Sequence, residues 1–138
     1  MSVMQQSLVT SLAGIVGPDR VKIDAESLQF FGKDWTKDYE PAPSAIVFPG
    51  SIDEVQALVR FANEQQIALV PSGGRTGLSG GAVASNGEVV VAFDRMNRIL
   101  DFNPVDRQVV CEPGVITGQL QQFAEDKGLF YPVDFASS

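Results

Sequence analysis

The sequence predicts an α+β fold, in which a small lobe built on parallel strands is followed by a second lobe that begins with a hairpin. Three observations support this fold class. Residues 45–70 show a strand–helix–strand pattern, typical of parallel strands joined by a crossover helix. Residues 88–93 form a continuous apolar run, as expected for a strand buried on both faces. Residues 98–112 contain two short strands around a turn with Pro and Asp, which indicates a hairpin.

The N-terminal part, residues 1–44, is expected to be a helix followed by a tether. Over residues 3–16 apolar side chains recur at helical spacing, and Gly17 and Pro18 end the pattern. Residues 24–43 are expected to be irregular, with aromatic side chains among charges and prolines that force an extended connector. These aromatic side chains either attach the segment to the next lobe by packing or contact a ligand, and both interpretations stay open.

The first lobe begins with the apolar strand at 45–48. A capping box follows, with Ser51 as the N-cap and Glu54 three residues later. The amphipathic helix after it is predicted to end near Gln66. We expect the next strand, at 67–70, to run parallel to the first, because a crossover helix joins them.

A change in the hydrophobic pattern at Asn97 indicates a boundary between two lobes, residues 45–97 and 98–138. After the hairpin of the second lobe, Thr117 is expected to cap a helix, and Gly128 is expected to lie just beyond its end. We expect the second lobe to be incomplete and to leave an unpaired sheet edge, which favours association into an oligomer.

The composition excludes several classes of function. The chain has 10 basic and 17 acidic residues and a net charge of −7, which disfavours nucleic acid and anionic membranes as partners. It contains no histidine, which removes Ser-His-Asp catalysis and histidine metal ligands, so no metal site is expected. The sequence shows neither a signal peptide nor an apolar run long enough to span a membrane, and we expect a cytoplasmic setting.

The single cysteine, Cys111, lies on an apolar strand of the expected hairpin. One thiol cannot form an internal disulfide or supply a cysteine-rich metal site. We expect Cys111 to be a buried small hydrophobic residue rather than a reactive thiol.

The segment at 71–81 carries the chemistry of the sequence. Its glycines allow a backbone to approach a ligand closely, and successive N–H groups in such a turn form an anion-binding nest. Hydroxyl groups and one arginine add donors. The loop also follows a parallel strand, where ligands collect in α/β sheets. The expected role is a cradle for a phosphate or pyrophosphate, and the alternative is a flexible surface loop. The residues are Pro71, Ser72, Gly73, Gly74, Arg75, Thr76, Gly77, Leu78, Ser79, Gly80 and Gly81.

Two well-known phosphate loops do not fit this segment. A Walker A loop requires a lysine, and the segment has none. A dinucleotide fingerprint requires G-x-G-x-x-G at the start of a long helix. Here the spacing from Gly74 is G-x-x-G-x-x-G, and a loop and then a strand follow.

Several motifs in one order give the sequence a family resemblance. It resembles flavoenzymes of the vanillyl-alcohol oxidase/p-cresol methylhydroxylase (PCMH) type, and most of all FAD-linked 2-hydroxyacid dehydrogenases such as D-lactate dehydrogenase, D-2-hydroxyglutarate dehydrogenase and the glycolate oxidase flavin subunit. The resemblance extends from residue 43 to the end of the chain. The motifs are AIVFP at 45–49, VPSGGRTGLSGG at 70–81, FDRMNRIL at 93–100, EPGV at 112–115 and GLFYPVD at 128–134.

The resemblance implies a PCMH-type FAD-binding domain made of two small α/β lobes. In such a domain the glycine loop would wrap the FAD pyrophosphate, and the turn at 112–114 would lie near the adenosine half. The stretch at 131–138 would lie along the flavin, with Pro132, Asp134 and Ser137 as further cofactor-binding residues. Members that attach FAD covalently through this loop use a histidine, which is absent here. We therefore expect non-covalent FAD.

Family members are much longer, so the resemblance implies that the 138 residues are the N-terminal portion of an FAD-dependent oxidoreductase. In the parent protein, the α-hydrogen of a small D-2-hydroxy acid would pass to flavin N5 as a hydride while a base takes the hydroxyl proton. No catalytic residue is assigned in this chain, which alone is expected to be inactive. Two alternatives stay open: a non-catalytic nucleotide- or phosphate-binding module, and a structural domain with an incidental glycine loop.

Overall fold

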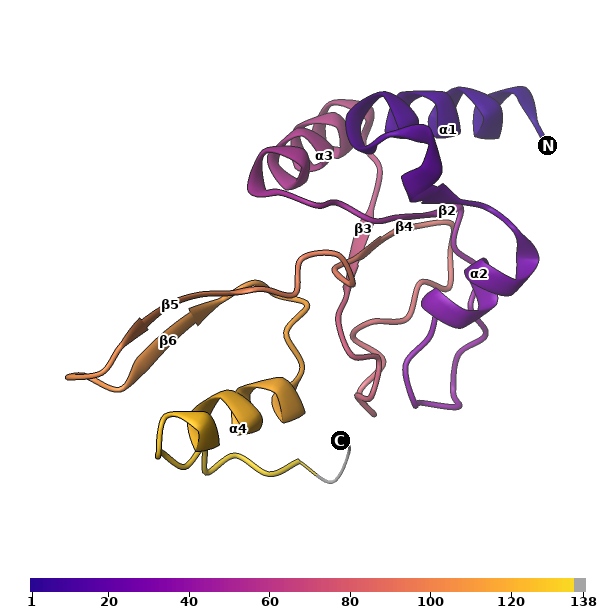
Figure 1. Cartoon of the computed structure of the whole chain (residues 1–138). Coiled ribbons are helices and arrows are strands. Elements are labelled where there is room, and N and C mark those ends of the chain that lie inside the picture. Colours follow the sequence, from indigo (N-terminus) through magenta and orange to yellow (C-terminus); the bar gives the residue numbers. More distant parts are fainter. Residues whose placement is uncertain (136–138) are drawn as a thin grey trace.

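Three of the four strands of the larger sheet are parallel in the computed structural model, which describes residues 1–135 (Figure 1). The strand order is β1-β2-β4-β3, with β1 antiparallel to β2 and the other pairs parallel. The bounds are Val21–Lys22 for β1, Ala45–Val47 for β2, Leu69–Ser72 for β3 and Val89–Ala92 for β4.

The strand–helix–strand pattern is confirmed, with α3 (Ile52–Gln65) connecting β2 to β3. The two strands are parallel as expected, but β4 lies between them and pairs with both. In this register Val90 is the partner of Ile46 on one side and of Val70 on the other. Strand β3 begins two residues later than the apolar run and extends to Ser72, directly before the glycine loop.

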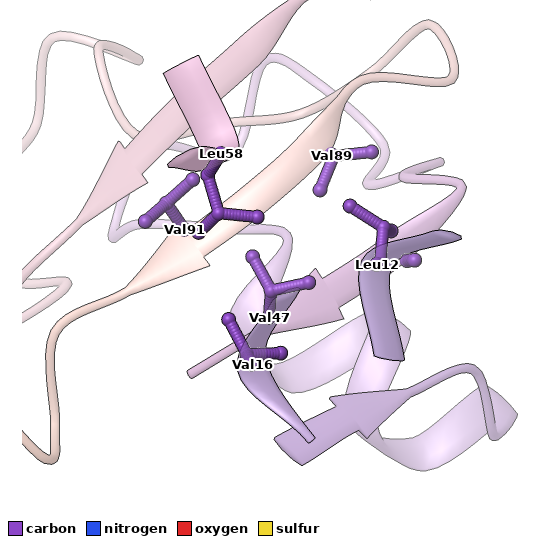
Figure 2. Close-up of a cluster of buried hydrophobic side chains, with 7 residues drawn as sticks. Leu12, Val16, Val47, Leu58, Val89 and Val91 are labelled. Carbon is purple, nitrogen blue, oxygen red and sulfur yellow. The ribbon is translucent and has the colours of Figure 1, made fainter. Parts of the chain in front are cut away.

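The main core lies between this sheet and two helices, α1 (Val3–Val16) and α3, which lie side by side over one face of it (Figure 1). Figure 2 shows side chains from both helices and from β2 and β4 pointing toward one another. All four residues of β4 are buried, which confirms the prediction of a strand covered on both faces. The buried cluster comprises Leu12, Val16, Ala45, Val47, Leu58, Val89 and Val91.

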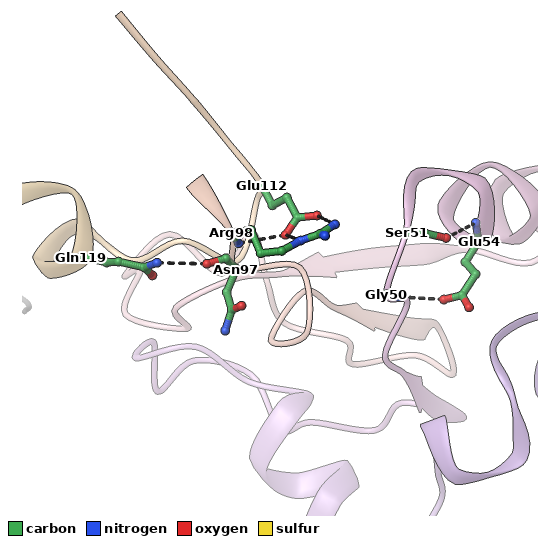
Figure 3. A network of polar contacts seen from close by, with 7 residues as sticks. All are labelled: Gly50, Ser51, Glu54, Asn97, Arg98, Glu112 and Gln119. Atoms are coloured by element: carbon green, nitrogen blue, oxygen red, sulfur yellow. Dashed lines mark hydrogen bonds and ion pairs between the residues drawn. The ribbon is translucent and has the colours of Figure 1, made fainter. Parts of the chain in front are cut away.

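The capping box of α3 forms with one change of partner (Figure 3). The backbone N–H of Glu54 donates to the Ser51 hydroxyl at 3.2 Å, as predicted. The Glu54 carboxylate accepts from the N–H of Gly50 at 2.6 Å instead of from the N-cap residue itself. The helix ends at a left-handed residue, Gln66, where its end was predicted.

The prediction that residues 24–43 are irregular is wrong in part, because the segment contains a short helix, α2 (Ala25–Phe31). Its N-cap is Asp24, whose carboxylate accepts from the backbone N–H of Ser27 at 2.9 Å; this bond lowers the pKa of Asp24. A helix of seven residues gives too short a hydrophobic pattern to detect. Phe31 packs edge-on against Phe48 at 4.9 Å between ring centroids, so this part of the segment does attach by packing.

The second part of the chain contains a hairpin and one helix, as predicted. The hairpin strands are β5 (Ile99–Asn103) and β6 (Gln108–Cys111), and the helix is α4 (Thr117–Asp126). Thr117 is the first helical residue, and the N-cap is Ile116, so the predicted cap is wrong by one position. Gly128 has φ +68° and lies just beyond the helix, as expected.

The prediction that Cys111 is buried is wrong, because its side chain is exposed. The apolar neighbours of Cys111 in the sequence suggested burial. Most residues of β6 are nevertheless exposed within the described part of the chain, including Val110. Burial in a hairpin depends on what covers its faces, and local sequence does not determine that.

A buried carboxylate closes the base of the hairpin. Glu112 is 7% exposed and accepts three hydrogen bonds from Arg98: from the backbone N–H at 2.8 Å, from Nε at 3.1 Å and from Nη2 at 2.7 Å. Helix α4 and the turn before it are attached to the first part of the chain. In α4, Gln119 Nε2 donates to the carbonyl of Asn97 at 3.0 Å (Figure 3). Gly114 N donates to the carbonyl of Met96 at 2.8 Å.

Gly114 has no room for a side chain. A Cβ atom at this position would collide with the carbonyl oxygen of Phe93 and would lie 2.7 Å from that of Met96. The backbones therefore approach as closely as only glycine allows. None of the helices within residues 1–135 is long and apolar enough to cross a membrane.

The Arg98–Glu112 pair predicts a pH dependence of stability. The hydrogen bonds from the Arg98 side chain, and then from its backbone, hold the pKa of Glu112 below its ordinary value. The pair therefore contributes its full stabilisation above the ordinary glutamate pKa, about 4.3, and loses it as the pH falls through the lower pKa of the folded chain. Arg98→Met should raise the pKa of Glu112 and flatten this acid-side dependence, as measured by carboxyl NMR titration and urea unfolding at several pH values.

Arg95→Met is the matched control, because Arg95 is an exposed neighbour that makes none of the ion pairs found within residues 1–135. If Arg98→Met and Arg95→Met lose stability on acidification as the wild type does, the pair does not contribute to the acid-side dependence.

Candidate functional site

The glycine loop, residues 73–81, leaves the C-terminal end of β3 directly beside the end of β4. Because the two strands are parallel, the residues that follow them meet at one edge of the sheet. Arg75 follows β3, Asp94 follows β4, and their side chains form an ion pair with two N···O distances of 3.0 Å. The pair joins the two loops at this edge.

An open cleft of about 1070 Å³ lies between the glycine loop and the start of α4. The loop contributes one side, and the turn before α4 with its first residues contributes the other. Trp35, which is 67% exposed, and Phe135 complete the lining. The lining residues are Trp35, Gly74, Thr76, Gly77, Leu78, Val115, Ile116, Thr117, Gly118 and Phe135.

Unpaired backbone donors line both sides of this cleft. Within the described part of the chain, the N–H groups of residues 73–79 donate to no other protein atom. The same holds for the N–H groups of Ile116, Thr117 and Gly118 at the start of α4, where no side chain caps the helix. A glycine-rich turn and a helix N-terminus each favour an anionic ligand. Together they provide donors on two sides for a ligand that carries phosphate.

Three glycines of the loop are not required by the protein's own packing. A Cβ atom built on Gly73, Gly74 or Gly77 would have its nearest neighbour at 3.9, 4.0 or 3.8 Å, which is ordinary contact. None of the three has a positive φ, so a side chain would be tolerated there by the backbone. Gly80 differs, with φ +75° and the ring of Tyr39 3.2 Å from a built Cβ. Neither the backbone nor the neighbouring atoms therefore require glycine at positions 73, 74 and 77, and two of these residues, Gly74 and Gly77, line the cleft.

The structure places Arg75 at the base of the loop and not in the cleft lining. Its φ is +59°, a conformation that is strained for a residue with a side chain. The guanidinium is bound by Asp94 and lies 4.8 Å from the centroid of the Phe31 ring, and the side chain is only 17% exposed. These contacts hold the strained residue in place, so the Arg75 charge is engaged within the protein.

The other predicted site residues divide into two groups. Thr76, Leu78, Gly74 and Gly77 line the cleft. Ser72 is fully buried and accepts from Arg75 Nη1 at 3.4 Å, whereas Pro71, Ser79 and Gly81 are exposed outside the lining.

The C-terminal stretch approaches the same cleft. Pro132 and Asp134 are exposed on an extended segment after α4, and Phe135 of that segment reaches the cleft. Ser137 lies outside the described residues. Residues 115–118 were not among the predicted site residues. The signal available in the sequence was the EPGV turn directly before a helix.

Within residues 1–135, no group of three or more Cys, Asp or Glu side chains is arranged to hold a metal ion. The donors of the cleft are backbone N–H groups and the hydroxyls of Thr76 and Thr117, a set suited to a phosphate and not to a cation.

Comparison with known proteins gives the chain a family. Residues 43–138 match the FAD binding domain family. The D-2-hydroxyglutarate dehydrogenases of Stutzerimonas stutzeri (strain A1501) and Xanthomonas citri pv. viticola are 67% and 49% identical to the chain over 96% and 97% of its length. D-lactate dehydrogenase of Anaerostipes hadrus is 39% identical over 86%. The chain spans 28%, 28% and 25% of these relatives, about a quarter of their length.

Solved structures confirm the predicted fold class. Substrate-bound p-cresol methylhydroxylase superposes with a TM-score of 0.77 at 25% identity, over 94% of this chain and 26% of that one. Alkyldihydroxyacetonephosphate synthase gives a TM-score of 0.78 at 21% identity, over 89% of this chain and 25% of that one, and shows a shared fold. The residues that match the FAD binding domain family, 43–138, include the glycine loop, the hairpin and α4. The chain therefore belongs to the FAD binding domain family.

Proposed function

We propose that the chain binds FAD in the cleft between the glycine loop and α4, with the pyrophosphate on the backbone N–H groups of residues 73–79. The observation that carries this proposal is the run of unpaired backbone N–H donors at 73–79 together with glycines at 73, 74 and 77 that the protein's own packing does not require. A pyrophosphate fits this set because it accepts several hydrogen bonds at once and its charge favours the N-terminal end of α4.

The remaining lining residues suit the rest of the cofactor. Thr76 and Thr117 offer hydroxyl donors on opposite sides of the cleft, and Trp35 offers an exposed aromatic face for stacking on a ring. We propose that residues 131–138 lie along the flavin, with Pro132, Asp134 and Ser137 near it, which the position of Phe135 in the cleft lining supports. Bound FAD would supply the redox chemistry, and this part of the chain would bind and orient it.

We propose that the whole protein oxidises a D-2-hydroxy acid, and that D-2-hydroxyglutarate is preferred over D-lactate and glycolate. The support comes from the relatives: the two D-2-hydroxyglutarate dehydrogenases are 67% and 49% identical to the chain, compared with 39% for the D-lactate dehydrogenase. None of the predicted cofactor-binding residues is proposed to contact the substrate.

Gly74→Val should weaken FAD binding strongly and leave the fold unchanged. A Cβ at this position meets no protein atom closer than 4.0 Å, so the added methyl groups occupy the space assigned to the pyrophosphate. Because Trp35 is the only tryptophan of the chain, FAD binding is measured by quenching of its fluorescence. The control is Gly14→Val, at a glycine in α1 that has nothing within 4 Å of a built Cβ.

Wild-type affinity for FAD in Gly74→Val would contradict the proposed loop role. Competition with ADP tests the alternative of a nucleotide-binding module. If ADP displaces FAD at equal concentration, the cleft recognises only the shared phosphate and adenosine chemistry, and the flavin plays no part in binding.

We propose that the FAD is held without a covalent bond. The glycine loop contains no histidine or cysteine for attachment, and the donors described above bind through hydrogen bonds. Acid precipitation of the FAD-loaded protein should leave a colourless pellet and a yellow supernatant. Flavin absorbance that stays with the washed pellet would show a covalent bond.

The substrate proposal is tested on the full-length protein purified with its flavin. D-2-hydroxyglutarate should bleach the flavin absorbance under anaerobic conditions with a second-order rate constant of flavin reduction at least about tenfold above those for D-lactate and glycolate. The L-enantiomer is the matched control. Equal bleaching by D-lactate, or none by any of the acids, would contradict the assignment.

A further inference from the structure

The segment between α2 and β2, residues 32–44, runs beside the glycine loop and the connection that follows it toward β4. One backbone hydrogen bond joins it to the loop, where Trp35 N donates to Gly77 O at 2.9 Å. Two more join it to Ala84 in the connection after the loop: Ala84 N donates to Gly32 O at 2.9 Å, and Ala42 N donates to Ala84 O at 2.8 Å. In Figure 1 the two connections lie close together on the side of the sheet away from α1 and α3. The loop and the connection after it are therefore supported by residues that precede the first parallel strand.

A buried carboxylate lies at the centre of this contact. Asp34 is 7% exposed, and its two oxygens accept from different segments. Oδ2 accepts from the N–H of Gly80 at 3.0 Å, and Oδ1 accepts from the N–H of Thr36 at 2.8 Å. A Cβ built on Gly77 would lie 3.8 Å from Oδ2, so the carboxylate also lies close to the middle of the loop.

No cation compensates this charge. The three ion pairs found within residues 1–135 do not include Asp34. A buried carboxylate without a cation is costly unless hydrogen bonds satisfy it. Here both bonds come from the backbone, so the charge is stabilised by the conformation of the loop and of its own segment. The same bonds in turn restrict Gly80, whose φ of +75° fixes the direction in which the loop returns.

Asp34 also separates the loop's donors into two sets. It takes the N–H of Gly80, while the N–H groups of residues 73–79 stay unpaired within the described chain. A loop with five glycines in nine residues loses much conformational entropy when it becomes ordered. A loop already ordered in the free protein binds its ligand more tightly, because this cost is removed from the binding step.

We propose that Asp34 is a positioning residue that holds the glycine loop in its ligand-binding conformation before the cofactor arrives. The proposal rests on the proposed FAD site, but its first consequence concerns the free protein. The amide hydrogens of Gly80 and Thr36 should exchange slowly with solvent in the absence of FAD, whereas that of Gly74, exposed and unpaired, should exchange fast.

The test compares Asp34→Asn with Asp38→Asn by amide hydrogen exchange in the free chain and by FAD titration. Asp38 is an exposed residue of the same segment whose carboxylate accepts from the Thr36 hydroxyl at 3.4 Å, so its variant removes the same charge without touching the loop. Because asparagine has one acceptor oxygen in place of two, Asp34→Asn should lose the protection of Gly80 or of Thr36, keep the protection of β4 and weaken FAD binding at least about tenfold. Asp38→Asn should resemble the wild type.

Asp34→Glu retains the charge and should recover part of both losses. If the amides of β4 also lose protection from exchange in Asp34→Asn, the test of the positioning role is made with Asp34→Glu instead. Fast exchange of Gly80 in the wild type, or unchanged FAD affinity in Asp34→Asn when Gly74→Val does lose affinity, would overturn the positioning role. A wild-type chain that protects Gly80 but binds no FAD would overturn the proposed FAD site. The conclusion that Asp34 orders the loop in the free chain would still stand.

Discussion

Placement of β4 between β2 and β3 is the constraint on which the rest of the structure depends. Because β4 pairs in parallel with both neighbours, all of its residues are buried and its end lies beside the end of β3. That geometry brings Arg75 and Asp94 together and sets the direction of the glycine loop. The turn after β4 then contacts Gly114 and so places the start of α4 across the cleft. The site is thus built from the carboxyl ends of two strands and the amino end of one helix.

An acidic chain with a net charge of −7 presents a cleft suited to a dianion. The apparent conflict disappears when the donors are considered atom by atom. The one arginine of the loop is already paired with Asp94, and the donors left facing the ligand are backbone N–H groups and hydroxyls. Backbone dipoles carry no net charge and cannot be titrated, so attraction for phosphate does not require a basic surface.

Much of the fold could be predicted from the sequence because it is encoded locally. The capping box at Ser51, the end of α3 at Gln66 and the continuous apolar strand β4 each have a short-range signal, and each is present. The strand order was not predictable, because pairing is decided by long-range contacts. Cys111 was misassigned for the same reason, since its burial depends on a partner surface and not on neighbouring residues. The glycine loop was identified by composition, but Asp34 was not, because its partner Gly80 lies 46 positions away.

The close approach at Gly114 acts as a spacer of fixed length between the two walls of the cleft. The walls meet there through main-chain atoms, with Gly114 against the carbonyls of Phe93 and Met96. Because main-chain atoms alone set the distance between the two walls, this distance stays the same when the surrounding side chains change. Thr76, Leu78, Ile116 and Trp35 are therefore free to vary in size and polarity without moving the walls apart. Substitutions at the rim can therefore change the chemistry of the cleft lining while the distance between its walls stays the same.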